Sequence, residues 1–289
     1  METIGKREVR SFLSSTEKPT NTTNNAIRHD EGHSVENFLD LAKKVAALQF
    51  ANPQFLFLFR GQSNDYKNQQ KNSSLQPSIF RPNRDRSKLT RELLMNRFNF
   101  LARAEESLVN KYEQNSEILG DGTLKLKRQR ILRWSILQHY EICFTPLLDV
   151  SQSLRVAASF ATSIESEKAF IYVLGVPNLN GTLTANAEAG LQIIRLSGVC
   201  PPSAVRPHIQ EGYLLGEYPD IPDFLQKQHY PVFEIDFGRR VIGKFVFNPQ
   251  TFWNDSDFPI ICKSALYPDD HDPMFNLAND LKNQLGKQE

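Results

Sequence analysis

Residues 169–176, AFIYVLGV, constrain the fold of this chain more than any other segment, because a tyrosine hydroxyl is their only polar side-chain group. A short apolar run that ends at Gly and Pro is typical of a buried strand. Similar but weaker patterns predict further strands at residues 54–60, 191–196, 212–215, 232–235 and 243–247. Most of the predicted strands therefore lie in the second half of the chain.

Helical patterns fill most of the first half. Apolar residues recur with a helical period after Ser34, which we expect to cap a helix at residues 35–48. Further helices are predicted at residues 88–118, 125–140 and 153–163, and the last of these has a face of small residues that can pack closely on a sheet. Helices in the first half of the chain and strands in the second half predict an α+β fold, in which the helical first half packs on the sheet.

Length and composition are those of an ordinary globular protein. The chain has 289 residues, and its 34 basic and 33 acidic side chains give a net charge of +1. This balance argues against a protein that coats nucleic acid through charge alone. Residues 1–34 include a polar stretch rich in Thr and Asn, so we expect a flexible N-terminal leader there and a single globular domain at residues 35–289.

Several common kinds of site have no support in the sequence. The three cysteines, Cys143, Cys200 and Cys262, form no CxxC pair and are expected to be reduced and buried. No metal is expected, since the histidines lack metal-binding spacing, and there is no Walker loop, GxGxxG motif or serine-hydrolase elbow. No window is apolar enough for a signal peptide or a membrane span, which predicts a cytoplasmic protein without membrane contact.

The first candidate for chemistry is Arg60-Gly61, at the end of the predicted strand 54–60 and before the turn-like residues 63–65. Arg offers five donors in a planar fork that matches phosphate or carboxylate oxygens, and Gly lets a ligand approach the backbone. The same residue types also fit a structural role, in which Arg60 pairs with an internal carboxylate and Gly61 makes a turn.

The second candidate is the segment 137–161, which carries polar and aromatic residues before the small-residue helix. Its candidates for a cleft are His139, Tyr140, Thr145, Asp149 and Ser151. A structural interpretation stands beside this one, because Asp149 or Ser151 can cap the following helix and His139 can be a buried histidine at a helix end.

The third candidate is Gln210-Glu211, between a proline-bounded loop and an apolar stretch. One of these two polar side chains can point into a cleft. A carboxylate supplies negative charge, whereas an amide can only form hydrogen bonds.

Four ordered segments together resemble the FRG domain family, which is named after a Phe/Tyr-Arg-Gly signature. They are residues 58–63 (LFRGQS), 75–81 (LQPSIFR), 137–161 and 266–269 (LYPD). Three positions depart from the family's usual pattern: Glu141 replaces a glycine, Pro146 an arginine and Val150 a tryptophan.

The order of the segments is also similar to that of ADP-ribosyltransferases, and this resemblance implies a split, mainly antiparallel sheet and NAD as substrate. Arg60 would contact the phosphate or ribose of NAD, and Gly61 the carboxamide. Gln210 or Glu211 would act at the nicotinamide–ribose bond, which breaks through an oxocarbenium-like state that negative charge stabilises. The other cleft residues would be Gln62, His139, Tyr140, Thr145, Asp149 and Ser151.

The resemblance further implies a macromolecular acceptor, protein or nucleic acid, a bacterial or phage-defence toxin as the setting, and an antitoxin or sensor as partner. Two alternatives stay open. One is a non-catalytic module that binds a nucleotide or nucleic acid through Arg60 and the basic side chains of residues 125–133, although those cations can also form a solvated face. The other is an NAD glycohydrolase, in which water is the acceptor.

Overall fold

The computed structural model describes residues 8–83, 89–114, 123–201, 203–254, 257–269, 272–286 and 288. The chain forms two compact units, where the sequence predicts one domain. Unit 1 comprises Met1–Leu75, Val150–Asn180 and Asp236–Leu266, and unit 2 comprises Gln76–Asp149, Gly181–Ile235 and Tyr267–Glu289. Helices combine with mainly antiparallel strands, which confirms the predicted α+β class.

Unit 1 is built on strands in the order β3-β10-β6-β4-β5, and all of these pairs are antiparallel except the parallel pair β3–β10. A separate antiparallel pair joins β1 and β2. The strands are β1 (Val9–Ser11), β2 (Thr20–Thr22), β3 (His33–Ser34), β4 (Leu56–Gln62), β5 (Leu148–Ser151, whose first two residues belong to unit 2), β6 (Ala169–Val176) and β10 (Val241–Phe247). The helices are α1 (Asn24–His29), α2 (Phe38–Ala51), α6 (Leu154–Ala161), α10 (Pro249–Phe252), α11 (Lys263–Leu266) and the 3₁₀ helix η3 (Phe237–Arg240).

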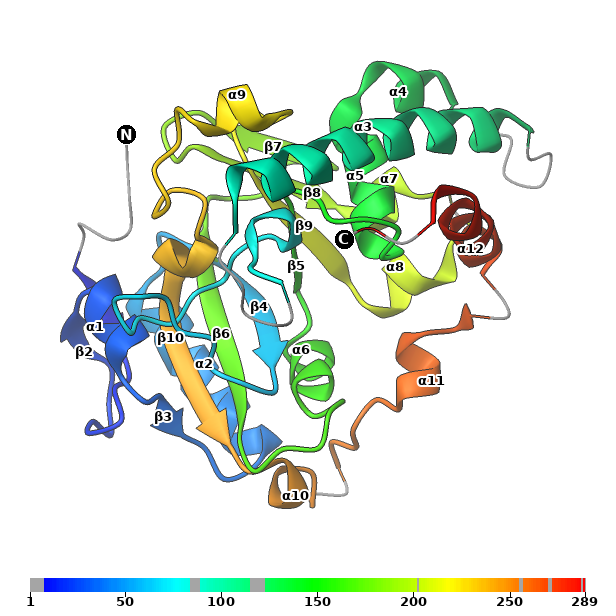
Figure 1. Ribbon diagram of the computed structural model, residues 1–289. Helices are drawn as coiled ribbons and strands as arrows, with labels where there is room; N and C mark the ends of the chain where they lie inside the picture. Colours follow the sequence, from blue (N-terminus) through cyan, green and yellow to red (C-terminus); the bar gives the residue numbers. More distant parts are fainter. Residues whose placement is uncertain are drawn as a thin grey trace. The chain divides into compact units, whose positions relative to one another are not determined.

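The three long strands of unit 1, β4, β6 and β10, lie side by side (Figure 1). β6 is buried along its whole length, as its apolar sequence predicts. Helices α2 and α6 cover one face of these strands, where Gly61 faces α6 and Gly243 faces α2. The opposite face carries Arg60, whose neighbours across the strands are polar.

Unit 2 contains the antiparallel strands β7 (Leu183–Asn186), β8 (Leu191–Arg195) and β9 (Gly212–Glu217) in sequential order. Helices α3, α5 and α12 pack together around a core that includes Trp134, Leu137 and Leu281. The helices of this unit are η2 (Ser78–Phe80, 3₁₀), α3 (Arg91–Gln114), α4 (Thr123–Arg128), α5 (Arg130–His139), α7 (Leu196–Val199), α8 (Val205–Ile209), α9 (Phe224–Lys227) and α12 (Pro273–Leu285). Among the described residues, no helix is long and apolar enough to cross a membrane.

Residues 8–34 are part of unit 1, in contrast to the flexible leader that their composition predicts. Ile27 is buried, and the amide of Asn24 donates to the carbonyl oxygens of Gly238 and Val241 at 2.9 and 2.7 Å. Arg28 forms a buried ion pair with Asp236 at 2.6 Å. The polar side chains that suggest disorder thus form hydrogen bonds with residues more than 200 positions away, which composition does not report.

Several predicted elements begin, end or divide differently. The helix predicted at residues 35–48 begins at Phe38, because Asn37 accepts a hydrogen bond from the Asp40 N–H at 2.8 Å and acts as its N-cap; Ser34 lies in β3 instead. The helix predicted at residues 125–140 is two helices, α4 and α5, which are separated at Gln129.

The strand predicted at residues 232–235 is wrong, since these residues form turns and a bend. Strand β4 continues beyond Arg60 to Gln62. All three cysteines are free thiols. Cys143 and Cys200 are buried, and burial raises the pKa of the Cys200 thiol to about 12. Cys262 is exposed, contrary to the prediction.

Candidate functional site

The Phe-Arg-Gly signature lies inside β4 and not at a turn. Arg60 stands opposite Tyr172 of β6, and Tyr172 stands opposite Lys244 of β10. Residues opposite one another in a sheet point to the same face, so the three side chains form one row across three strands. Arg60 is half-buried, whereas Lys244 is only 1% exposed. A guanidinium is therefore placed on a rigid central strand beside a phenol and a buried ammonium.

Asp65 holds this row from the loop that follows β4. It accepts hydrogen bonds from the Tyr172 hydroxyl at 2.8 Å, the Lys244 ammonium at 2.7 Å and the Ser73 hydroxyl at 2.6 Å. Burial alone would raise the pKa of Asp65, but these three donors and the charge of Lys244 outweigh it and hold the pKa below its usual value. Asp65 is thus an anion at neutral pH and ties its loop to the sheet.

Tyr172 is a neutral hydrogen-bond donor in this network. Burial raises the pKa of its hydroxyl far above the usual value, the charge of Asp65 raises it further, and the charge of Arg60 acts in the opposite direction. Sequence reasoning missed both Asp65 and Tyr172, because Asp65 has the pattern of a turn residue and Tyr172 that of a buried strand.

Gly61 is required by the packing of α6. A methyl group at this position would lie 1.8 Å from the carbonyl oxygen of Ala157 and 3.0 Å from Cβ of Ala161. The turn role considered for Gly61 is wrong, since the residue is paired with Ile171 within the sheet. The predicted small-residue face of α6 is what permits this close approach.

Gln62 and Ser151 differ in how their side chains are used. The side-chain oxygen of Gln62 is buried and has no hydrogen-bond partner among the described residues. Ser151 accepts a hydrogen bond from the Ser153 N–H at 3.0 Å, so it shapes the turn before α6. The cap of α6 is Ser153, whose hydroxyl accepts from the Val156 N–H at 3.4 Å, and neither Asp149 nor Ser151 has that role.

In unit 2, Gln138 connects two of the family segments. Its side-chain oxygen accepts from the hydroxyls of Thr145 at 2.5 Å and Ser78 at 3.2 Å, and its amide donates to Asp149 at 2.5 Å. The structure therefore brings the predicted residues Thr145 and Asp149 together. Gln138 and Ser78 were not predicted as site residues, although both lie in segments that carry the resemblance.

His139 and Tyr140 are both deeply buried. Nδ1 of His139 lies 3.9 Å from Oδ1 of Asp149, and its Nε2 has no hydrogen-bond partner within the described part of the chain. Burial lowers the pKa of His139, although the nearby Asp149 opposes that shift. The Tyr140 hydroxyl donates to Asp272 at 2.9 Å, which anchors Tyr140 to the N-cap residue of α12.

The lowered pKa of His139 predicts an acid-dependent loss of stability. The folded state binds this proton less readily than the unfolded state, whose histidine titrates near 6.5, so the free energy of unfolding should fall as the pH drops below that value. Denaturant unfolding at pH 7.5 and pH 5 should show a smaller acid-induced loss in His139→Asn than in the wild type. An identical loss in both proteins would contradict a neutral, buried His139.

Glu141 occupies a backbone conformation that suits the glycine which the resemblance implies at this position. Its φ of 55° lies in the left-handed region, which glycine adopts without strain. Here the Glu141 carboxylate lies 3.1 Å from Arg206, whose guanidinium stacks on the ring of Tyr267 at 4.5 Å. Tyr267 belongs to the fourth family segment, so this contact joins it to the third.

Gln210 and Glu211 lie between α8 and β9. Gln210 is the C-cap residue of α8 and is 7% exposed. Glu211 is exposed and has a φ of 43°. Glu211 is therefore charged and open to solvent, whereas Gln210 is neutral and buried.

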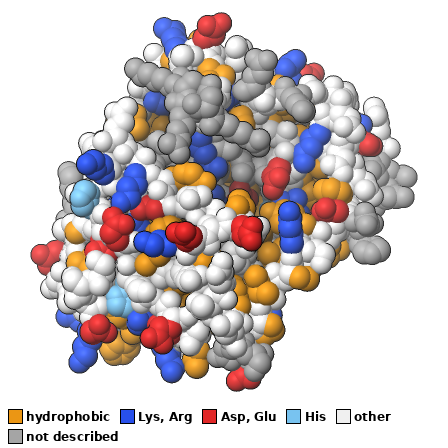
Figure 2. Space-filling view, turned by 60° about the horizontal axis from the view of Figure 1, so that its bottom comes forward, with side chains coloured by type: hydrophobic (Ala, Val, Ile, Leu, Met, Phe, Trp, Pro, Cys, Tyr) orange, Lys and Arg blue, Asp and Glu red, His pale blue; other side chains and the backbone are white. Residues whose placement is uncertain are grey.

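The basic segment 125–133 is largely paired within unit 2. Arg133 lies 2.8 Å from Glu105 of α3 and also donates to the carbonyl oxygens of Leu126 and Lys127. Lys127 pairs with a second glutamate of α3. Figure 2 shows acidic and basic side chains interspersed on the face that it displays. Neither observation favours a basic stripe for nucleic acid.

No cluster of three or more His, Cys, Asp or Glu side chains that could hold a metal is found among the described residues.

The structure defines an α+β protein in which a half-buried arginine lies on a central strand. Residues 56–169 match the family model of the FRG domain, so the chain carries an FRG domain over these residues. The match includes Arg60, Gly61 and the predicted residues from His139 to Ser151, and it ends before Gln210. No curated protein and no solved structure matches the chain.

Proposed function

We propose that this FRG-domain protein binds NAD and transfers ADP-ribose to a protein or nucleic-acid acceptor. The observation that carries this proposal is the position of Arg60, half-buried on β4 within a row that Asp65 fixes through Tyr172 and Lys244. A half-buried arginine on a central strand presents a planar fork of donors that matches the pyrophosphate oxygens of a dinucleotide.

In the proposed reaction, a nucleophile of the acceptor forms a bond to C1 of the nicotinamide ribose. The bond from C1 to the nicotinamide nitrogen breaks, its electron pair leaves with neutral nicotinamide, and the nucleophile loses its proton. Glu211 is the better candidate than Gln210 to stabilise the positive charge on the ribose, because Glu211 is exposed and charged while Gln210 is buried. Gly61, Gln62 and Ser151 remain candidates for contacts to NAD. The hydroxyl of Thr145 and the carboxylate of Asp149, which are both hydrogen-bonded to Gln138, are candidates too.

Incubation with NAD that is labelled in its adenylate phosphate tests this activity. With a cell lysate, the wild type should label a macromolecule, and protease or nuclease treatment should identify its class. Arg60→Ala should reduce labelling by at least about tenfold, as expected for loss of a charged hydrogen bond. Arg195→Ala, an exposed arginine at the end of β8, serves as the matched control. Labelling that is equal in both variants would contradict the role of Arg60.

The same assay separates transfer from its alternatives. Release of nicotinamide without a labelled macromolecule would indicate hydrolysis of NAD, with water as the acceptor. Binding of NAD without either product would indicate a non-catalytic module. Glu211→Gln should lower the rate while leaving NAD affinity nearly unchanged, since its charge acts on the transition state. A toxin or defence setting, with an antitoxin or sensor partner, is part of the proposal. It predicts that expression of the wild type inhibits the growth of the expressing cells, whereas expression of Arg60→Ala does not.

A further inference from the structure

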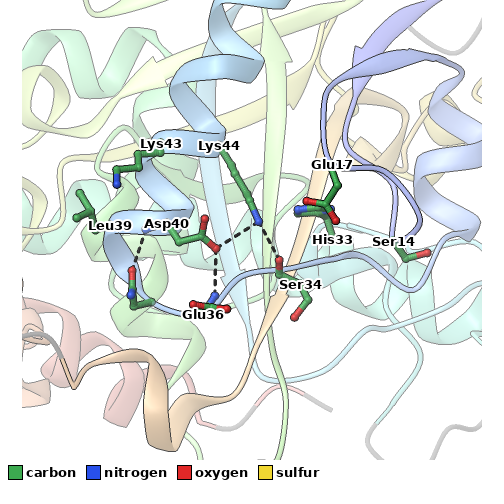
Figure 3. Close-up of a pocket in the computed structure, with 10 residues that line it drawn as sticks. Ser14, Glu17, His33, Ser34, Glu36, Leu39, Asp40, Lys43 and Lys44 are labelled. Carbon is green, nitrogen blue, oxygen red and sulfur yellow. Dashed lines mark hydrogen bonds and ion pairs between the residues drawn. The ribbon is translucent and has the colours of Figure 1, made fainter.

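A polar hollow of about 540 Å³ opens in unit 1, beside β3 and the N-terminal half of α2 (Figure 3). This volume falls within the range of roughly 300–1,000 Å³ that small-molecule sites occupy. The hollow lies outside residues 56–169, which match the FRG domain. The side chains that matter for its chemistry are Glu17, His33, Glu36, Asp40, Lys43 and Lys44.

His33 presents an unpaired acceptor at this hollow. Its Nδ1 lies 3.0 Å from the carbonyl oxygen of Leu13, which can only accept, so Nδ1 carries the proton and Nε2 of the neutral ring has a lone pair. His33 is 5% exposed, and its Nε2 is buried without a partner among the described residues. Figure 3 shows the ring pointing from β3 into the hollow beside Glu17. A buried acceptor in this state is favourable only when a ligand or water donates to it.

The charges around His33 favour a cation. Three carboxylates and two lysines line the hollow, so its net charge is −1 with neutral His33 (2 − 3 = −1). Asp40 and Lys44 neutralise each other at 3.3 Å. Glu17 and Glu36 have no ion-pair partner in the described part of the chain, and the ammonium of Lys43 is the single opposing charge without one.

The N-terminus of α2 does not offer a competing anion site. The Asp40 N–H donates to the side chain of Asn37 at 2.8 Å, and the Glu36 N–H donates to the carboxylate of Asp40 at 3.2 Å. The amides of Glu36 and Asp40 are thus already bonded to oxygens of the protein, and Asp40 places a negative charge at this helix end.

We propose that the hollow binds a small organic cation with primary ammonium groups, of the aliphatic polyamine class. Each ammonium donates three hydrogen bonds, which suits the unpaired acceptors His33 Nε2, Glu17 and Glu36. A polyamine carries more than one ammonium and can engage carboxylates at separate points of the hollow. No Phe, Tyr or Trp is present among the described residues of the lining, so cation–π binding of a quaternary ammonium has no support.

Calorimetric titration with spermidine at constant ionic strength tests this site. The wild type should bind saturably, and the double variant Glu17→Gln/Glu36→Gln, whose changes are exposed, should bind at least about tenfold more weakly. Glu165→Gln removes an exposed carboxylate elsewhere in unit 1 and should bind as the wild type does. Tetramethylammonium, which has no N–H donor, should not bind.

A change at the buried histidine provides a second readout. His33→Asn retains an N–H for the Leu13 carbonyl and removes Nε2, and it should also weaken spermidine binding at least about tenfold. If His33→Asn does not fold, the double variant Glu17→Gln/Glu36→Gln still tests the proposed site. Three results would each overturn the proposal: no saturable spermidine binding up to roughly 10 mM, equal binding by the double variant, or binding of inorganic phosphate that Lys43→Ala abolishes.

Discussion

Gly61→Ala is expected to destabilise the protein by about 3 kcal/mol or more, toward the upper end of overpacking effects. The added methyl group would lie 1.8 Å from the backbone carbonyl oxygen of Ala157, and a backbone atom within a helix cannot rotate away as a side chain can. Helix α6 would have to move away from β4. Urea unfolding followed by circular dichroism measures this loss.

A glycine in the neighbouring strand provides the matched control. The three atoms nearest to a methyl group on Gly175 of β6 would all be side-chain atoms, at 3.1 Å for Phe55 and from 3.2 Å for Ile242, so Gly175→Ala should cost about 1 kcal/mol. Ala157→Gly should not rescue Gly61→Ala, because the obstacle is the carbonyl and not the methyl group of Ala157. Equal stability of the Gly61→Ala variant and the wild type would contradict the packing of α6 on β4 described here.

Asp65→Asn is expected to lower the free energy of unfolding by about 3–5 kcal/mol, because it leaves the ammonium of Lys244 buried without its anion. Lys244 would keep neutral contacts, such as the carbonyl oxygen of Asp30 at 2.6 Å and the ring of Phe170, but would lose this anion. The pKa of Asp65 is lowered in the folded state, so its contribution is complete above the unfolded value of 3.8 and is lost as the pH falls through the folded pKa. The stability difference between wild type and variant should therefore shrink in strong acid.

Lys67 is the matched control for the buried pair. It lies 3.6 Å from the same carboxylate, but its side chain is 32% exposed, so Lys67→Met should cost no more than about 1 kcal/mol. The double variant Asp65→Asn/Lys244→Met should be less destabilised than the sum of its single variants, since neither charge is then left unpaired. Additive losses, or equal losses for Lys67→Met and Asp65→Asn, would argue against a coupled buried pair.

The parts of the fold that sequence predicts well are those with a strong local pattern. β6 is found at residues 169–176 as its apolar run predicts, and the small residues at positions 157 and 161 of α6 pack against β4. Both features depend on residues that are close in the sequence. A period or an apolar run is therefore enough to find them.

The network around Arg60 lacks such a local signal. Asp65 bonds to Tyr172 and Lys244, which are 107 and 179 positions away. Before the strands are paired, Asp65 has the pattern of a turn residue and Lys244 that of a surface charge. The same reason applies to residues 8–34, whose polar side chains form hydrogen bonds with distant parts of unit 1.

The residues of the candidate site stay predictions, but some of their contacts can be compared with the sequence. Thr145 and Asp149 were both predicted as cleft residues, and in the structure Gln138 is hydrogen-bonded to both. The sequence did not predict that Tyr140 is bonded to Asp272, because that contact depends on the helix near the end of the chain. Which of these residues touch NAD stays a prediction.

The most direct test of the proposed function is a calorimetric titration of NAD into the wild type and into Arg60→Lys. This change keeps the charge and removes the planar fork that would hold the pyrophosphate. Saturable binding by the wild type, with an affinity at least about tenfold lower in the variant and with thermal unfolding unchanged, is the predicted result. No binding by the wild type, or the same affinity in both proteins, would contradict it.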